Sequence, residues 1–290
     1  MNRILLMVLI IIYLCSGVLP LSAQQNSTLK DAVRDQYLEK IDEDGLSQIE
    51  NSANLSSLDP YSHFLTEKEL VDVSELAAFQ PFALPISDRI LYLRIPVFHA
   101  KTAYQVHQAL TIALQNTKFK AVIIDLRGNK GGLLNAAIEV ADEFIKEGKL
   151  ASTKGRQDIS NLIFLGKSAG LAEELKVAVI IDKNTASAAE LLAGILRINV
   201  AAPLIGQNSY GKSAVQSQIH LQSGGQLKLT TAYYYFSDGS TVSQTGLIPN
   251  VQISPWQLWR YPPLINALAK QPEDLLNPLL KKAINSISLE

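Results

Sequence analysis

An α/β fold is predicted for this 290-residue chain by three observations. From Ile90 onward, segments with the two-residue periodicity of strands alternate with segments that have helical spacing. Two short apolar runs, residues 121–124 and 177–181, are typical of parallel strands that are buried on both faces. Each run leads through a turn into an amphipathic or Ala/Leu-rich segment. Strands and helices that alternate in this way form a parallel sheet covered by helices.

The composition limits the classes of partner. Hydrophobic residues make up 47% of the chain, so the core is ample, and the formal net charge of -1 points neither to nucleic acid nor to an anionic membrane surface. No metal, nucleotide or other cofactor is predicted. The four histidines are scattered without the spacing of metal ligands. They are His63, His99, His107 and His220.

Residues 1–23 are predicted to be a secretory signal, in which an apolar run ends at a small-residue cleavage site. Two alternatives remain open. One is an uncleaved anchor, because residues 4–21 nearly match the thickness of a bilayer. The other is lipidation of Cys15, the single cysteine, against which the bulky Leu14 argues. We therefore expect an exported protein, periplasmic or otherwise extracytoplasmic, and membrane-anchored if the leader is retained.

A small helical region is expected at residues 24–80. Apolar residues recur at helical spacing in 29–41 and 46–55, and a further helix is expected at 66–69. Before that last helix lies Leu58-Asp-Pro-Tyr-Ser-His63, which by itself is a proline turn. His63 is expected to be a packing or turn residue.

Three polar residues near the second buried strand are the candidate catalytic residues: Ser187, Lys212 and Gln216. Ser187 opens an Ala/Leu-rich helix directly after the run 177–181, and Lys212 begins an alternating strand. A hydroxyl is a weak nucleophile until a base removes its proton, and a lysine amine can do so if burial lowers its pKa. Residues 212 and 216 share one face of a strand, so Gln216 can orient Lys212 without adding charge.

Backbone amides near Ser187 are candidates for stabilising an oxyanion. The N–H of Ala188 lies at a helix N-terminus, where it has no helical partner. The turn Arg127-Gly-Asn-Lys-Gly-Gly132 is a second candidate, because glycines let a backbone amide approach a ligand closely. On its own, an ordinary glycine-rich turn is the simpler interpretation.

The chain resembles the carboxyl-terminal processing peptidases, also called tail-specific proteases, through four motifs in the same order. They are Leu58-Asp-Pro-Tyr-Ser-His-Phe-Leu65, Asp125-Leu-Arg-Gly-Asn-Lys-Gly-Gly132, Asn184-Thr-Ala-Ser-Ala188 and Tyr210-Gly-Lys-Ser-Ala-Val-Gln216. The resemblance implies a fold similar to the ClpP/crotonase superfold. It further implies Ser187 as nucleophile, Lys212 as general base and Gln216 as its partner. The implied oxyanion hole combines Ala188 with Gly131 or Gly132.

One part of the family pattern is missing. Relatives usually carry a peptide-binding PDZ domain before the first catalytic strand, whereas residues 66–89 are far too few for a domain. Residues 81–89, with Pro81 and Pro85, are expected to be a linker in its place. A catalytic domain with C-terminal helices is expected at 90–290.

A phosphate-binding loop is the main competing interpretation of the lysine. Residues 206–213 match G-x-x-x-x-G-K-[ST] letter for letter, but such a loop requires a helix after the lysine. Residues 214–221 instead alternate like a strand, and a hairpin with residues 226–235 is expected. A hairpin or insertion is also expected within 150–176.

The predicted function is that of an exported serine endopeptidase of the C-terminal processing type, acting on proteins or peptides through a Ser-Lys dyad. The alternative is a latent or inactive peptidase-fold binding protein that depends on a partner. An adaptor or activating protein in place of the PDZ domain and a homo-oligomer are both left open, and no nucleic acid is expected as a partner.

Overall fold

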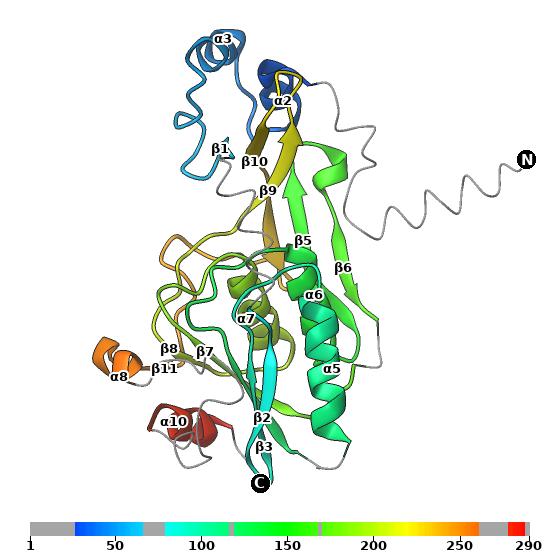
Figure 1. Ribbon diagram of the computed structural model, residues 1–290, viewed down its shortest axis with the longest axis vertical. Coiled ribbons are helices and arrows are strands. Elements are labelled where there is room, and N and C mark those ends of the chain that lie inside the picture. Colours follow the sequence, from blue (N-terminus) through cyan, green and yellow to red (C-terminus); the bar gives the residue numbers. More distant parts are fainter. Residues whose placement is uncertain (1–26, 66–78, 116–118, 168–169, 261–277, 288–290) are drawn as a thin grey trace, which may run out of the picture. The chain divides into compact units, whose positions relative to one another are not determined.

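In the computed structural model (Figure 1), the chain is divided into two compact units. The structure describes residues 27–65, 79–115, 119–167, 170–260 and 278–287. The N-terminal unit comprises Met1–Leu70, Gly155–Asn161 and Ala214–Ala232. The sheet unit comprises Val71–Lys154, Leu162–Ser213 and Tyr233–Glu290. The predicted leader and the helix expected at 66–69 lie outside the described residues. Within the described ranges, no helix combines the length and the apolar character that a membrane span needs.

Two helices and a small antiparallel sheet form the N-terminal unit. Helix α2 (Leu29–Gln36) is capped by the side chain of Thr28, and helix α3 (Glu43–Ser52) by that of Asp42. Strand β10 (Gln226–Phe236), which continues into the sheet unit, pairs with β1 (His63–Phe64) and with β9 (Ala214–His220). The helices and strands share one apolar core. Its buried members are Ala32, Val33, Tyr37, Leu46, Ile49, Leu55, Ile219, Leu221, Leu227 and Leu229.

The Leu-Asp-Pro motif fixes a turn in this unit. Asp59 accepts hydrogen bonds from the N–H groups of Tyr61 at 2.7 Å and Ser62 at 2.9 Å, and from the hydroxyl of Thr230 at 3.1 Å. His63 is the first residue of β1, and its Nδ1 lies 2.8 Å from the carbonyl oxygen of Tyr61 in the turn.

A six-stranded sheet organises the sheet unit, and the α/β prediction is confirmed. From one edge to the other its strands are β11 (Val251–Gln252), β8 (Leu204–Gly206), β7 (Lys176–Ile181), β4 (Ala121–Asp125), β3 (Ile90–Arg94) and β2 (Phe82–Ser87). All neighbouring pairs are parallel except β2 and β3. The predicted runs 121–124 and 177–181 are the central strands β4 and β7, and β4 is buried throughout.

Helices cover the sheet. Helices α5 (Thr102–Leu114), α6 (Leu134–Asp142) and α7 (Ala188–Asn199) lie side by side (Figure 1). The apolar core of the other layer includes side chains from α8 (Pro255–Arg260) and α10 (Pro278–Ser286). Ile123 of β4 belongs to that core. Because successive strand residues point to opposite faces, Val122 and Ile124 face the other side, where they are also fully buried.

The prediction of a linker at residues 81–89 is wrong, because these residues contain β2. Strand β2 pairs with β3 in antiparallel register, with Leu84 opposite Tyr92, and the register shifts after Pro85. Proline is tolerated there because β2 is the edge strand of the sheet and the chain bulges at that point. Only residues 65–81 lie between β1 and β2, which leaves no room for an inserted domain.

A hairpin is found between β4 and β7, where the sequence predicts a hairpin or an insertion, and β9 pairs with β10 as predicted for residues 214–221 and 226–235. Strands β5 (Gly148–Gly155) and β6 (Ile163–Gly166) pair antiparallel, with the short 3-10 helix Asp158–Ser160 between them in sequence. Strand β9 follows the lysine of the G-x-x-x-x-G-K-[ST] match, where a phosphate-binding loop requires a helix. The structure therefore rules out that interpretation.

Candidate active site

Ser187 stands at a sharp turn between β7 and α7. Its backbone has φ 56° and ψ −118°, outside the regions that non-glycine residues ordinarily occupy. Such a conformation costs on the order of 1–3 kcal/mol and persists only where its surroundings hold it. The turn places the serine side chain beyond the carboxyl end of a central strand, where open α/β sheets bind ligands.

The turn after β4 packs directly against Ser187. A Cβ atom added to Gly131, whose φ is 97°, would lie 2.9 Å from Cβ of Ser187 and 3.0 Å from the nitrogen of Ala188. A Cβ atom on Gly132 would lie only 2.0 Å from the carbonyl oxygen of Phe98. Glycine is therefore required at both positions, because a larger residue would collide with the serine turn at position 131 and with the backbone of Phe98 at position 132.

The two glycine amides differ in their partners. The N–H of Gly131 donates to Oδ1 of Asn129 at 2.8 Å, and Asn129 is fully buried. For the N–H of Gly132, no acceptor is found among the described residues. The carbonyl of Gly131 accepts from the N–H of Phe98, and in a trans peptide the next N–H points the opposite way. The Gly132 N–H is thus directed away from Phe98.

A buried carboxylate, Glu190, ties the serine turn to the lysine. Its Oε2 accepts from the N–H of Ser187 at 2.8 Å and from the N–H of Lys212 at 2.9 Å. Its Oε1 accepts from the hydroxyl of Ser209 at 2.5 Å and from the N–H of Gly211 at 2.7 Å. Glu190 is fully buried, and its four donors come from two loops that are far apart in the sequence. One side chain therefore fixes the backbones of both predicted catalytic residues.

Tyr234 of β10 joins the same two segments. Its hydroxyl donates to the carbonyl oxygen of Ser187 at 3.4 Å, and its N–H donates to the carbonyl of Ser213 at 3.1 Å. Burial raises the pKa of the Tyr234 phenol well above its ordinary value, and the nearby charge of Glu190 raises it further. Tyr234 consequently stays protonated and can act as a donor throughout the physiological pH range.

A cluster of buried charged side chains lies at the start of the turn that follows β4. Asp125, at the end of β4, accepts from Nε of Arg127 at 3.0 Å and from the hydroxyl of Tyr92 at 2.8 Å. Arg94 donates to the carbonyl oxygens of Asp125 and Arg127, each at 2.8 Å. Burial would raise the pKa of Asp125, but the charge and hydrogen bonds of Arg127, together with the charge of Arg94, outweigh burial and lower it.

Replacing Asp125 by asparagine is expected to lower the free energy of unfolding by about 3–5 kcal/mol at pH 7, because Arg127 loses its counter-charge while it stays buried. The lowered pKa of Asp125 in the folded state means that its contribution is present above the unfolded value of 3.8 and is lost as the pH falls further. Urea unfolding at pH 7 and near pH 3 should therefore show a smaller difference between wild type and variant at the lower pH. The exposed Asp88, changed to asparagine, is the control, and equal stability of both variants at pH 7 would contradict the expectation.

The predicted site residues are distributed over both units. Ser187, Ala188, Gly131, Gly132 and Lys212 lie in the sheet unit, where Gly131 contacts the serine turn and Glu190 binds both loops. Gln216 lies in the N-terminal unit, where its Nε2 donates to the carbonyl oxygen of Tyr61 at 2.5 Å. Within the described part of the chain, no three His, Cys, Asp or Glu side chains are placed to hold a metal ion.

Sequence inspection missed Glu190. The spacing Ser187-x-x-Glu190 is that of a capping box, in which the glutamate at the third helical position binds the N–H of the capping serine. That signal predicts the bond to Ser187. The bonds to Ser209, Gly211 and Lys212 depend on the loop after β8, and only the structure reveals them.

Comparison with known proteins points to one family. The sequence pattern of peptidase family S41 matches residues 89–253. The chain is 37% identical over 165 residues to the carboxy-terminal-processing protease of Bartonella bacilliformis, covering 56% of this chain and 38% of that protein. It is 30% identical over 187 residues to the carboxyl-terminal-processing protease of Synechocystis, covering 64% and 43%.

A solved structure agrees with these sequence relatives. The photosystem II D1 C-terminal processing protease superposes with a TM-score of 0.52 at 27% identity, covering 58% of this chain and 43% of that one. The chain thus spans less than half the length of each of these relatives. Since the family pattern covers more than half of the chain and includes both the serine turn and the lysine loop, the protein belongs to peptidase family S41.

Proposed function

We propose that the protein is an exported serine endopeptidase of the C-terminal processing type, with Ser187 as nucleophile and Lys212 as general base. The observation that carries the proposal is the shared carboxylate oxygen: Oε2 of Glu190 accepts from the backbone N–H of both residues. This oxygen thereby joins two loops that are distant in the sequence. The names of the relatives, which are carboxyl-terminal processing proteases, support the same reaction class.

In the proposed reaction, the neutral amine of Lys212 takes the proton of the Ser187 hydroxyl as Oγ attacks the carbonyl carbon of the scissile peptide bond. The tetrahedral intermediate collapses, the leaving amine receives the proton from Lys212, and the acyl group stays on Ser187. A water molecule then gives its proton to Lys212 and attacks the ester carbonyl carbon. Lys212 returns the proton to Oγ of Ser187 as the C–O bond breaks, and the acid is released. Because the lysine must be neutral to accept a proton, the rate is expected to rise with pH until the amine is fully deprotonated.

The oxyanion of the intermediate is assigned to the N–H groups of Ala188 and Gly132. Ala188 is the first residue of α7, where the backbone N–H groups have no helical partner. Gly132 is preferred to Gly131 because the Gly131 N–H already donates to Asn129. Gln216 is proposed to support Lys212, as the family resemblance implies.

A fluorophosphonate probe tests the nucleophile directly, because only an activated serine reacts with it. Purified protein is treated with the probe, the labelled peptide is mapped by mass spectrometry, and casein cleavage is measured before and after labelling. We expect one label, on Ser187, and loss of casein cleavage in proportion to it. Cleavage that continues after full labelling of Ser187, or a label on a different serine, would contradict the proposal.

The same test addresses the alternative of a latent or inactive binding protein. Residues 65–81 leave no room for a PDZ domain between β1 and β2, so we propose that an adaptor or activating protein supplies that domain's role. A latent enzyme would be labelled only when such a partner is present, whereas a ligand carrier would not be labelled in either condition. We also propose that the segment 1–23 directs export of the protein and that copies of the chain can associate into a homo-oligomer.

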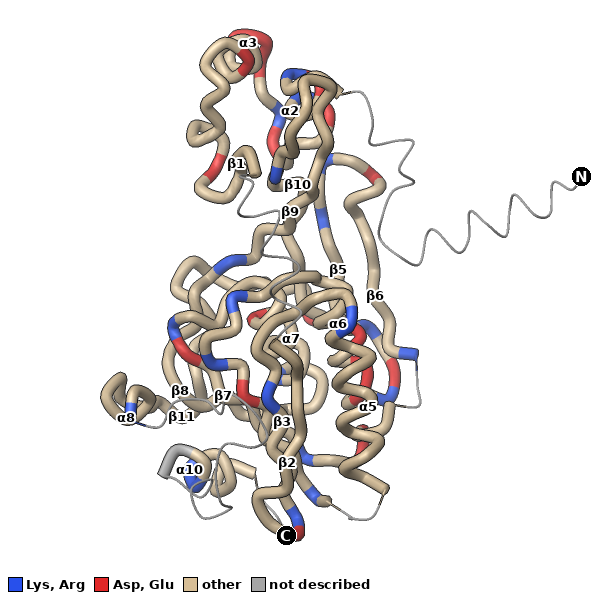
Figure 2. The backbone as a smooth tube through the Cα atoms, in the orientation of Figure 1, with Lys and Arg blue, Asp and Glu red and all other residues tan. Residues whose placement is uncertain are grey.

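Protein or peptide substrates fit the distribution of charge. Lys and Arg are interspersed with Asp and Glu along the described backbone (Figure 2), in keeping with the net charge of -1.

A further inference from the structure

Two exposed tryptophans lie on the outer side of the layer that contains α8 and α10. Trp256 and Trp259 of α8 are 63% and 82% exposed. Residues three apart lie on the same face of a helix, so both indoles project from one side of α8. Leu258, between them, is buried in the apolar core to which α10 also contributes. Because large aromatic rings gain free energy when they leave water, a pair left exposed on one face indicates a binding surface.

The charged side chains of this layer are basic. Arg260 ends α8, Lys281 and Lys282 belong to α10, and all three are exposed. Neither helix contains an acidic residue, and the sequence has none between Gly239 and Arg260. Figure 2 shows blue without red on the described parts of both helices. The formal net charge of -1 for the whole chain therefore conceals a local excess of positive charge beside the two indoles.

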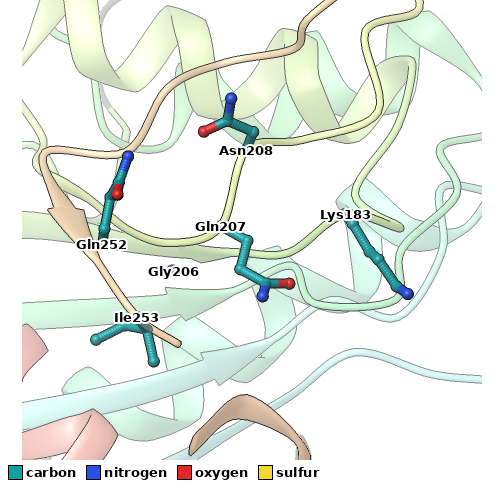
Figure 3. A pocket seen from close by; sticks show the side chains of 6 residues that line it. All are labelled: Lys183, Gly206, Gln207, Asn208, Gln252 and Ile253. Carbon is teal, nitrogen blue, oxygen red and sulfur yellow. The ribbon is translucent and has the colours of Figure 1, made fainter. Parts of the chain in front are cut away.

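Positive charge also occurs next to α8, at the edge of the sheet that carries β11. Gln252 of β11 and the adjoining Ile253 line a hollow of about 380 Å³, and Figure 3 shows Lys183 on its other side. The other lining residues are Gly206, Gln207 and Asn208. Asp182, next to Lys183, is not part of the lining and accepts from the N–H of Gly128 at 3.0 Å. The hollow beside α8 thus adds an ammonium group and no carboxylate.

We propose that the α8–α10 face, formed by Trp256, Trp259, Arg260, Lys281 and Lys282, binds the surface of an anionic lipid bilayer. Indole rings favour the boundary between hydrocarbon and headgroups, because the ring is apolar and its N–H can donate a hydrogen bond. Basic side chains are attracted by the negative headgroups. A bilayer therefore satisfies both kinds of side chain at once.

A second copy of the chain fits this face less well. Two copies related by a twofold axis would bring the same patch together, so that Arg260, Lys281 and Lys282 would meet their own equivalents. Like charges that face each other disfavour such an interface. On a bilayer, in contrast, the fold itself would hold the catalytic domain at a membrane surface, whether or not the segment 1–23 is removed.

Intrinsic fluorescence reports on this face alone, because Trp256 and Trp259 are the two tryptophans of the chain. The full chain is titrated with vesicles of equal parts phosphatidylcholine and phosphatidylglycerol, and separately with vesicles of phosphatidylcholine. We expect the emission to shift to shorter wavelength with the mixed vesicles, and the shift to weaken as sodium chloride screens the charges. Residues 1–23 contain no tryptophan, so insertion of that segment alone does not move the emission.

Removal of two basic residues tests the electrostatic part. Lys281→Gln/Lys282→Gln should weaken the apparent Kd for the mixed vesicles by roughly 25-fold, from about fivefold for each basic residue near an anionic surface. Lys101→Gln/Lys146→Gln is the matched control, because it removes the same charge from two exposed lysines that adjoin α5 and α6. The control should bind like wild type, and a loss of equal size in both proteins would overturn the proposal.

Quenching tests whether the indoles enter the bilayer. In the single-tryptophan proteins Trp256→Phe and Trp259→Phe, lipids brominated on the acyl chains should quench the remaining indole in mixed vesicles. Absence of both shift and quenching would overturn the proposal in favour of a protein partner. An emission that shifts with protein concentration in the absence of lipid would overturn it in favour of a second copy. The fluorophosphonate probe should label Ser187 equally in all these proteins, so a failure of lipid binding is distinguishable from a failure of the proposed function.

Discussion

The Ser187→Ala protein is expected to lose casein cleavage by roughly 10⁴-fold or more, because removing the nucleophile of a serine protease removes the covalent pathway. Lys212→Ala should cause a loss of similar size, since the serine hydroxyl then has no base to take its proton. In the proposed mechanism both residues act in the same step, so the double variant should be little worse than either single variant. Initial rates of casein cleavage measure all three variants against wild type.

Stability must be measured alongside these rates. Alanine has no more difficulty than serine at the φ of 56°, and the N–H of residue 187 still reaches Glu190, so the thermal midpoint of Ser187→Ala should stay close to wild type. Ser213→Ala is the matched control, because Ser213 adjoins Lys212 and its only hydrogen bond with the described residues is made by its carbonyl, which accepts from the N–H of Tyr234. Its activity should remain within about threefold of wild type, as for substitutions outside the machinery. A folded Ser187→Ala protein with wild-type activity would exclude the proposed mechanism.

Glu190→Gln is expected to have the second-largest effect, a loss of both stability and catalytic rate. The glutamine amide has the same size as the carboxylate but only one acceptor oxygen. Its N–H₂ group must therefore face two of the four donors that the carboxylate binds. If that end replaces Oε2, the N–H groups of Ser187 and Lys212 lose their acceptor. Leaving one buried donor unpaired costs about 1–3 kcal/mol, so the loss of both bonds should lower the free energy of unfolding by roughly 2–6 kcal/mol.

The kinetic effect of Glu190→Gln should fall on kcat more than on KM. The carboxylate positions the backbones of the nucleophile and of the base, and a misplacement of about 1 Å can cost on the order of 100-fold in rate. Glu139→Gln, an exposed change on α6, is the control and should alter neither stability nor kcat. A Glu190→Gln protein that is less stable yet keeps the wild-type kcat would limit Glu190 to a structural role.

Local signals in the sequence explain why Ser187 and Lys212 are predicted as catalytic residues. The serine follows a continuous apolar strand and opens a helix, and the lysine starts an alternating strand, so both are visible in short windows of sequence. The network around Glu190 is different. A glutamate at the third helical position is an ordinary capping residue, and its bonds to Ser209, Gly211 and Lys212 require a loop about twenty residues away to fold back onto the helix.

The position of β2 at the edge of the sheet explains why the prediction of a linker at residues 81–89 is wrong. Two prolines argue against a strand when it is assumed to be central, because a central strand needs every backbone N–H. Whether a strand lies at an edge depends on the order of strands, which short-range periodicity does not contain. The choice between the two glycine amides was open for a similar reason, since the bond from Gly131 to Asn129 is a detail of the turn conformation.

The N-terminal unit is assembled from stretches that leave the ribosome at very different times. Its first helices bury Ala32 and Leu46 in a core that is completed by Ile219 and Leu229. At a synthesis rate of about 5–20 residues per second, the early helices wait on the order of 10–40 seconds for those strands. During that interval their apolar faces have no native partner. Helices α2 and α3 are therefore made before the strands that stabilise them, and the N-terminal unit is unfinished until residues 214–232 have been translated.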